Sequence, residues 1–483
     1  MKDLKARFIR GGIAKVLGQG AAMALQLVHV VVLSRLLSPE DFGLVAMVTS
    51  FVGILFLLKD FGLSTATIQR GEVTDAQLTA LFWLNVAAGA CLMLLTWLAT
   101  PALVSFFREP RLLWIGFAAG FAFLLTGAGV QHAALLQRQM RFTTLALIET
   151  TAMFGGVATG VLMAVMDFGY WSLVGMSLAN PAILSALAWL ASGWRPAWPS
   201  MGAPIGPMLK VGGVITANSI LMYAAYNLDK ILIGRLFGSD ALGLYSRSYQ
   251  LANMPTSTLN AAVGTVSMSA LSRVKDEPER LKKYFLGSYS VLMGLTLPIT
   301  VACGLFSTEV VAILLGPKWS AAASIFLLLV PTILVFGMIN PLWPFMVSQG
   351  LHARSLKMAL VLAPLVVASY FAGVPFGSEG VAAAFSTFMM LWLVPHLAWA
   401  IHGTMVGLKD IFVSISRPLA SSLLALGGTY FAKLWLLDGL TAGQRLAAGS
   451  IILGTLYATL LLFAFGQKGL YLDIVRSVRG SGA

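Results

Sequence analysis

Charged side chains inside apolar segments are the residues of this sequence best placed to do chemistry. Lys59–Asp60 and Asp229–Lys230 each lie near the end of a long apolar run, and Arg247 lies inside one, in the stretch YSRSYQ. An ionised group in hydrocarbon is costly, so such residues usually face water, a partner charge or a ligand. We expect Arg247 to point into a water-filled cavity. For the two Lys–Asp pairs, mutual neutralisation near the membrane surface explains the residues equally well.

Other basic residues could receive an anionic headgroup. Arg70 and Arg273 lie at the predicted inner ends of two apolar segments, Arg354 begins another, and Lys15 lies one or two turns into the first. Arginine suits a diphosphate because its planar guanidinium donates two parallel hydrogen bonds. The structural alternatives are anchoring of helix ends by positive charge and, for Lys15, extension of the side chain to the membrane surface.

The elements that must position these residues are membrane helices. Hydrophobic residues make up 58% of the 483 residues and charged residues only 11%, whereas soluble proteins carry about 25% charged residues. Apolar segments without a cleavable signal or an inserted soluble domain predict an all-α polytopic membrane protein. With roughly 20 residues needed to cross a ~30 Å hydrocarbon core, we predict about fourteen spans, at 10–33, 42–62, 79–99, 112–132, 144–166, 170–191, 210–233, 241–268, 286–306, 321–346, 356–375, 380–401, 418–437 and 446–466.

The distribution of Lys and Arg sets the orientation. With the N-terminus inside, about 22 of these residues fall in inner segments and about 7 in outer ones, which is the bias expected of inner loops. Both termini are therefore predicted to be cytoplasmic. The net charge of +13 is explained by topology, and nucleic-acid binding is not expected.

Two loop segments of the sequence each occur in two similar copies. The segment 34–47, SRLLSPEDFGLVAM, matches 234–247, GRLFGSDALGLYSR, and 67–85 matches 270–288 in the same order. Thr74 with Gln77 predicts a capping box before one helix, and Pro278 predicts the first turn of its counterpart. We therefore predict two six-helix lobes in parallel orientation around a central cavity, over 1–205 and 206–403, with two further spans and a tail over 404–483. Parallel repeats of this kind are typical of alternating-access transporters.

Within a transporter, three ionisable residues are candidates for coupling to an ion gradient: Asp60, Asp229 and His29. His29 and Asp229 occupy matching positions of the repeat, and each could titrate during a proton-coupled cycle. A packed polar residue is the structural alternative. Polar residues of the predicted cavity helices would suit sugar hydroxyls or interhelical hydrogen bonds equally; they are Gln19, Gln26, Asn85, Asn218, Tyr223, Tyr226 and Asn227.

Catalytic chemistry finds little support. The sequence holds no phosphate-binding loop of the G-x-x-x-x-G-K-[ST] type, its five histidines are scattered, and its two cysteines lie in apolar runs. The predicted outer loops are too short for an acceptor-binding domain. We expect no enzyme activity, no bound metal and no cofactor.

The quoted loops also carry a resemblance. RLLSPEDFGLVAMV, KDFGLSTATIQRGEVTDAQLTALFWLN, NLDKILIGRLFGSDALGLYSRSYQLANMP and FGSEGVAAAF resemble polysaccharide flippases of the multidrug/oligosaccharidyl-lipid/polysaccharide exporter superfamily, in the branch of colanic-acid-type and lipopolysaccharide-biosynthesis exporters. The resemblance implies two lobes in a V and a basic cavity, which Lys230, Arg247, Arg70 and Arg273, with Lys59, would supply. Where the family often has Asp-Arg, this chain has Asp229–Lys230, which keeps the charge and loses the bidentate geometry.

The function that the resemblance implies is transfer of a polyprenyl-diphosphate-linked oligosaccharide from the inner to the outer leaflet, driven by an H⁺ or Na⁺ gradient. Its partners would be the lipid-linked oligosaccharide, membrane lipids, and polymerase or assembly proteins of polysaccharide synthesis. Three alternatives stay open at this point: a lipid II flippase, a multidrug or cation antiporter of the same superfamily, and a scaffold that transports nothing. The mainly basic mid-span charges argue against a cation exporter, and the repeat argues against a scaffold.

Overall fold

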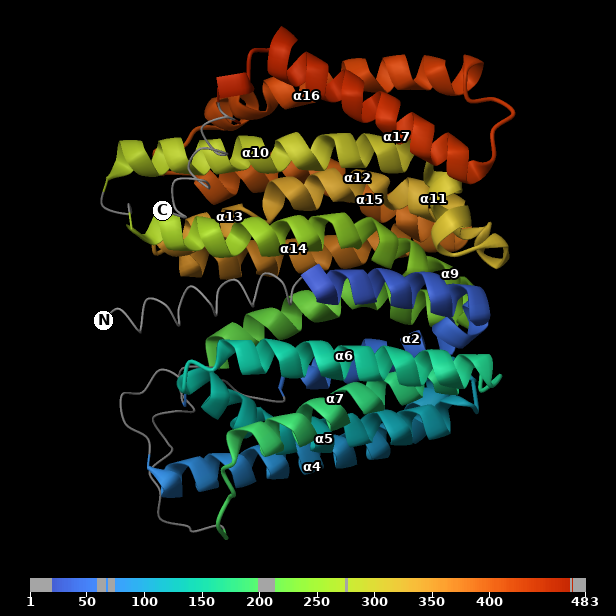
Figure 1. Cartoon of the computed structure of the whole chain (residues 1–483), viewed down its shortest axis with the longest axis vertical. Helices are drawn as coiled ribbons and strands as arrows, with labels where there is room; N and C mark the ends of the chain where they lie inside the picture. Colours follow the sequence, from blue (N-terminus) through green and yellow to red (C-terminus); the bar gives the residue numbers. More distant parts are fainter. Residues whose placement is uncertain are drawn as a thin grey trace. The chain divides into compact units, whose positions relative to one another are not determined.

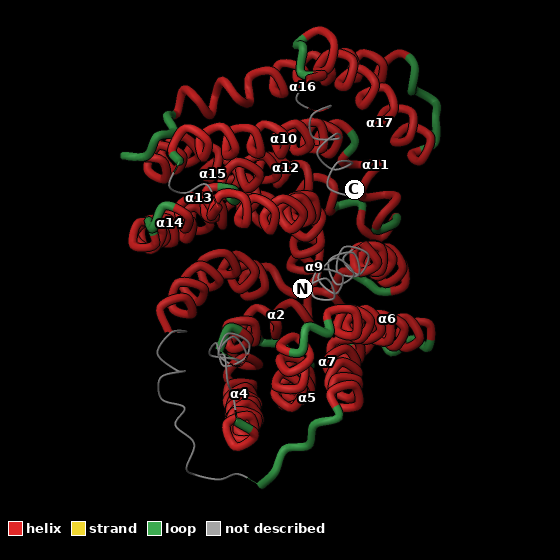
Figure 2. Tube along the Cα trace, turned by 60° about the vertical axis from the view of Figure 1, so that its left-hand side comes forward, coloured by secondary structure: helices red, strands yellow, loops and turns green. Residues whose placement is uncertain are grey.

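The structure, a computed structural model, describes residues 20–58, 67, 74–198, 213–273, 277–469 and 471. Within these residues the chain is helical between short connections and contains no strand (Figures 1 and 2). The chain folds as two compact units, one ending at Ser246 and the other beginning at Arg247. The prediction of lobes at 1–205 and 206–403, with a central cavity between them, stays a prediction.

The first unit is a bundle of antiparallel helices. α4 packs along α5, α5 along α7, and α7 along α6, so these four helices form its body (Figure 1). Capping fixes where α2 and α4 begin: Ser38 and Asp41 form a capping box, and Thr74 and Gln77 form the predicted one, with Gln77 N donating to Thr74 Oγ1 over 3.3 Å. The described helices of this unit are Gly20–Leu36, α2 (Pro39–Phe56), α4 (Asp75–Phe107), α5 (Leu112–Arg138), α6 (Phe142–Val165), α7 (Trp171–Ser192) and the first part of α9 (Gly213–Arg273).

The second unit is built around α10, α12 and α15. Pro278 stands in the first turn of α10, as predicted, and Pro341 lies where the predicted span 321–346 breaks into α12 and α13. The core is aromatic, with Phe326, Phe345 and Phe385 fully buried. The remaining helices are α10 (Pro278–Leu305), α11 (Ser307–Leu314), α12 (Ala322–Ile339), α13 (Leu342–Ser348), α14 (His352–Gly373), α15 (Gly377–Ile401), α16 (Leu408–Trp435) and α17 (Ala442–Thr459), which ends in a π turn at Leu460–Ala464.

The C-terminal pair α16 and α17 is fixed to α10 along its length. Lys282 Nζ binds Asp410 Oδ2 over 2.7 Å near the start of both α10 and α16. Further along, the Tyr457 hydroxyl of α17 donates to the Gly294 carbonyl oxygen over 2.6 Å. Ala425, Leu453, Tyr457 and Leu461 form a buried cluster against this side of α10. The appended helices are thus an integral part of the second unit.

α9 covers the predicted span 210–233 from residue 213 onward and all of the predicted span 241–268, and it joins them without a loop. The only interruption within this helix is Gly238, whose φ of 85° and ψ of −177° lie outside helical values. A positive φ is readily adopted only by glycine, so Gly238 permits the kink that turns one span into the next.

The repeated loops meet each other inside the first unit. A Cβ at Gly43 would overlap the Ser239 carbonyl, and a Cβ at Gly243 would overlap the Pro39 carbonyl. The repeat offset, 243 minus 43, is the offset between 239 and 39 as well, so the contact is reciprocal. Each copy of the loop supplies one glycine and one backbone carbonyl to a close approach that only glycine permits.

Ten helical segments of the described residues are long and apolar enough to cross a membrane, and Gly20–Leu36 is a shorter apolar helix. Each of the fourteen predicted segments overlaps a described helix, so the all-α membrane class is confirmed, while the count of fourteen crossings stays a prediction. α9 is the longest helix, with 61 residues, yet it is not among the ten.

Candidate substrate and ion site

The polarity of α9 identifies it as the element on which a site would be built. Its first part carries Asn227, Asp229 and Lys230, and its second part carries Arg247 and Gln250. In a chain whose other long helices are apolar, such a helix faces protein or water rather than lipid. Of the residues singled out from the sequence, Asp229, Lys230 and Arg247 lie on this helix, which departs from the apolar pattern of the other long helices that the structure describes.

Asp229 is the centre of a buried polar cluster in the first unit. Its side chain has no exposed surface, and its two carboxylate oxygens are used by different donors. The Tyr245 hydroxyl donates to Oδ2 over 2.8 Å, and the Lys230 backbone N–H donates to Oδ1 over 2.7 Å. Tyr245 follows the Gly238 kink and Asp229 precedes it, so this hydrogen bond joins the two arms of α9. The Asp229 carboxylate, a titratable group, therefore takes part in a contact that spans the kink.

Lys230 and its neighbours form a second layer of polar groups. The Lys230 ammonium donates to Asn227 Oδ1 over 2.6 Å, and Asn227 Nδ2 donates to the Tyr223 carbonyl over 2.9 Å. The Tyr223 hydroxyl reaches α2, where it donates to the Thr49 carbonyl over 3.3 Å. These half-buried side chains supply one cation and several hydrogen-bonding groups that suit a polyol or a phosphate.

Arg247 begins the second unit and is buried there, with 5% of its surface exposed. Its Nη1 donates to Gln250 Oε1 one turn further along α9. The next residue, Ser248, donates to the Ala322 carbonyl of α12 over 2.9 Å, which holds this part of α9 against the core. The guanidinium is thus positioned by its helix and bonded to a neutral amide. Its predicted exposure to a water-filled cavity stays a prediction.

Arg354 has a partner that the sequence did not suggest. Its Nη1 donates to the Ala400 carbonyl over 3.1 Å and to the His402 carbonyl over 2.6 Å, at the C-terminal end of α15. In the first unit, Arg141 before α6 donates to the Ala191 carbonyl at the end of α7 over 2.7 Å. A cation at a helix C-terminus satisfies free carbonyls and the helix dipole. Arg354 therefore has a structural role here, and the same role recurs in both units.

Two of the other predicted site residues lie on described helices. His29 is half-buried on the helix Gly20–Leu36, and Arg273 is the last residue of α9. Lys15, Lys59, Asp60 and Arg70 lie outside the described residues. Tyr245 is the residue that sequence reasoning missed. The sequence signal for its contact with Asp229 was Gly238, a residue at which the helix could bend.

Comparison with known proteins identifies the family of this chain and several relatives. The chain matches the family described as polysaccharide biosynthesis protein over residues 32–324, more than half of its 483 residues. It is 26% identical over 354 residues to the lipopolysaccharide biosynthesis protein WzxC of Escherichia coli (strain K12), covering 72% of this chain and 71% of that protein. It is 27% identical over 426 residues to the teichuronic acid biosynthesis protein TuaB of Bacillus subtilis (strain 168), covering 85% of this chain and 86% of that protein.

The fold has a close counterpart among solved structures. The lipid II flippase MurJ in its inward closed conformation matches with a TM-score of 0.74, covering 97% of this chain and 100% of that one, at 13% identity. That likeness establishes a helical membrane-transporter fold. The length of the family match confirms the family read from the sequence: this chain belongs to the polysaccharide biosynthesis protein family, and its fold is that of a helical membrane transporter.

Proposed function

We propose that this protein moves a polyprenyl-diphosphate-linked oligosaccharide, a precursor of a surface polysaccharide, across the bacterial inner membrane by alternating access. The observation that carries the proposal is a buried guanidinium, Arg247, and a buried carboxylate, Asp229, on the one long polar helix of a polysaccharide-biosynthesis protein. Both termini would lie in the cytoplasm, as the distribution of Lys and Arg predicts.

The chemistry of α9 suits each part of such a substrate. A diphosphate pairs well with a guanidinium, such as Arg247 in the second unit, or with an ammonium, such as Lys230 in the first. Sugar hydroxyls donate to and accept from amides and phenols, which Asn227 and Tyr223 supply. The lipid tail needs no polar partner and stays in the bilayer. Arg70, Arg273, Lys59 and Lys15 would extend the basic surface toward the cytoplasmic entrance.

Asp229 is the proposed coupling residue. Binding of H⁺ or Na⁺ to its carboxylate changes how it accepts the Tyr245 hydroxyl, and that hydrogen bond joins the two arms of α9 across Gly238. The ion would therefore alter the preferred angle of the kink, which is the kind of differential interaction that a coupled transporter requires. His29 and Asp60 are the other coupling candidates.

The test combines genetics with lipid analysis. Deleting the gene should cause one lipid-linked oligosaccharide to accumulate on the cytoplasmic leaflet, and the intact gene should clear it. Arg247→Ala should fail to clear it, while Arg417→Ala, which removes an exposed arginine on α16, should succeed. Accumulation of lipid II would replace this proposal with a peptidoglycan role, and full rescue by Arg247→Ala would remove Arg247 from the site.

Coupling is tested separately in proteoliposomes. Transport by the intact protein should follow an imposed proton or sodium gradient, and Asp229→Asn should abolish that dependence while binding of the lipid-linked substrate remains. Gradient-dependent transport by Asp229→Asn would exclude Asp229 as the coupling residue.

A further inference from the structure

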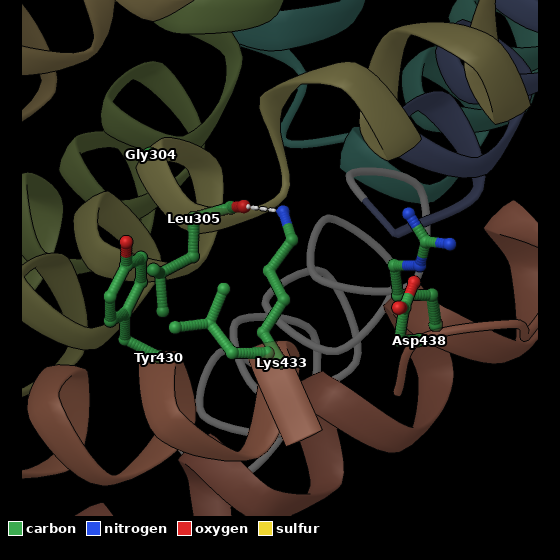
Figure 3. Close-up of a pocket in the computed structure, with 7 residues that line it drawn as sticks. Gly304, Leu305, Tyr430, Lys433 and Asp438 are labelled. Carbon is green, nitrogen blue, oxygen red and sulfur yellow. Dashed lines mark hydrogen bonds between the residues drawn. The ribbon is translucent and has the colours of Figure 1, made fainter. Parts of the chain in front are cut away.

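A cavity lies at one end of the C-terminal helix pair, and none of its lining residues belongs to the site described above. Its volume is about 380 Å³, and it lies entirely within the second unit (Figure 3). The end of α10, the end of α16 and the first turn of α17 surround it. Its lining residues are Gly304, Leu305, Tyr430, Lys433, Leu434, Asp438 and Arg445.

A buried carboxylate holds the two cations of this cavity in place. Glu309, only 4% exposed, accepts from Lys433 Nζ at 3.3 Å and from Arg445 Nη1 at 3.4 Å. Lys433 also donates to the Leu305 carbonyl and lies 5.0 Å from the Phe306 ring centre. Arg445 Nη2 donates to the Leu440 carbonyl over 3.2 Å. The cations are thus fixed before any ligand arrives, which lowers the entropy cost of binding one.

One donor at this wall is unused. Among the described residues, Arg445 Nε is buried and has no hydrogen-bond partner. A buried N–H of a charged group without a partner is costly, and an acceptor entering the cavity would relieve that cost. A phosphate oxygen is the acceptor that a guanidinium binds best.

The carboxylate of Asp438 adds a negative charge to the lining of the cavity. Asp438 is exposed, lines the cavity apart from Lys433 in Figure 3, and makes no ion pair with any residue that the structure describes. Lys433 and Arg445 balance Glu309 and Asp438, so the site has no net charge, and Asp438 is not ion-paired with either cation. That pattern matches a zwitterion better than an anion.

The side chains around the cavity are of the kinds found at the level of lipid headgroups. Trp435, 82% exposed, and Tyr430 stand at the end of α16, and aromatic residues at helix ends are enriched at the membrane–water interface. Phe431, Leu434 and Leu436 are exposed on the same segment and offer an apolar surface to acyl chains.

We propose that this cavity binds the headgroup of phosphatidylethanolamine. The phosphate accepts hydrogen bonds from Arg445 and Lys433, the primary ammonium donates to Asp438, and the acyl chains lie along the exposed face of α16. Phosphatidylglycerol has no cation for Asp438. The quaternary ammonium of phosphatidylcholine has no N–H to donate. The site is separate from the residues of the proposed transport function and does not depend on it.

The test measures lipid binding by native mass spectrometry of the full-length purified protein, with the three lipids carrying identical acyl chains. Phosphatidylethanolamine should bind about tenfold more tightly than either of the others, the size of one charge-assisted hydrogen bond. Asp438→Asn should abolish that preference and leave phosphatidylglycerol binding equal or tighter. Lys318→Met, at an exposed lysine outside the cavity, should change nothing. Equal binding of all three lipids by the unchanged protein would overturn the proposal.

A second variant tests the phosphate side. Arg445→Gln should weaken binding of phosphatidylethanolamine and phosphatidylglycerol alike, and added phosphatidylethanolamine should raise the melting temperature of the unchanged protein but not of this variant. Because Arg445 also binds Glu309, its loss could lower stability, whereas exposed Asp438 makes no such contact. Persistence of the ethanolamine preference in Asp438→Asn would refute the site whatever Arg445→Gln does.

Discussion

Two ion clusters of opposite composition follow equivalent helices of the two units. After α4, the cation Arg111 binds two carboxylates, Glu40 at 2.6 Å and Glu109 at 2.8 Å. After α10, the carboxylate Glu309 binds two cations, Lys433 and Arg445. The first cluster is open to solvent, with Arg111 42% and Glu40 47% exposed, whereas Glu309 is 4% exposed.

That difference in burial decides what each cluster does. Exposed ion pairs contribute about 0–1 kcal/mol because solvent screens them. A buried charge that loses its partner costs about 3–5 kcal/mol, since it must stay desolvated without compensation. The cluster in the first unit, which links the start of α2 to the residues before α5, therefore contributes little to stability, whereas the cluster in the second unit fixes α16 and α17 to α11.

The largest expected effect comes from Glu309→Ala. Removing this carboxylate leaves Lys433 and Arg445 close together and unneutralised, and we expect the free energy of unfolding to fall by about 3 kcal/mol. Glu40→Ala is the matched control and should cost less than about 1 kcal/mol. Unfolding in mixed micelles measures both, and equal losses would break the contrast between the clusters.

The second-largest expected loss of stability comes from a substitution at Gly243, a buried position without charge. Gly243→Val places a side chain where the Pro39 carbonyl lies, and we expect overpacking to cost about 2–3 kcal/mol. Gly454→Ala, where a Cβ would meet nothing within 4 Å, should be neutral or stabilising by less than about 1 kcal/mol. Thermal melting in detergent compares the two. A harmless Gly243→Val would mean that the loops can separate at little cost.

Tyr245→Phe removes the hydroxyl that donates to the buried carboxylate of Asp229. Asp229 keeps the Lys230 backbone N–H but loses the phenol, and we expect a loss of about 1–2 kcal/mol. Faster hydrogen exchange should be confined to residues around the Gly238 kink, because the hydrogen bond joins its two arms. Exchange that is unchanged there would show that the kink does not depend on this bond.

The smallest effect is a pH dependence in the exposed cluster. The hydrogen bond from Arg111 holds the pKa of Glu109 below its ordinary range. Since the folded pKa is the lower one, its stabilisation is complete above the unfolded value of about 4.3 and disappears as the pH falls through the folded value. Glu109→Gln should cost less than about 1 kcal/mol at pH 7 and nothing in strong acid. Melting curves across this range supply the comparison, and a cost that grows on acidification would reverse the assignment.

Local chemistry explains what could be predicted from the sequence. Thr74 with Gln77 and Pro278 mark helix starts because capping depends on residues three positions apart. The repeated loops, the apolar segments and the charged residues within some of them were also visible. These features depend on short-range pattern and composition, which a sequence displays directly.

Contacts across a bend could not be predicted in the same way. Asp229 meets Tyr245 only because Gly238 adopts a positive φ, and a glycine in a sequence does not reveal the angle it takes. Arg354 is predicted as a headgroup ligand because an arginine at a helix start has many uses, and that role stays a prediction. The carbonyls that it binds at the end of α15 are about 46 residues away, and this contact depends on how two helices pack.

The reciprocal contact of Gly43 with Ser239 and of Gly243 with Pro39 limits how the two loops can change length. An insertion between Pro39 and Gly43 would move one glycine out of register with its carbonyl while the other contact still held the backbones together. Deletions act in the same way. Lengthening of this loop in one half should therefore be accompanied by a compensating change in the other, so that the duplicated segments keep a common spacing even where their side chains diverge.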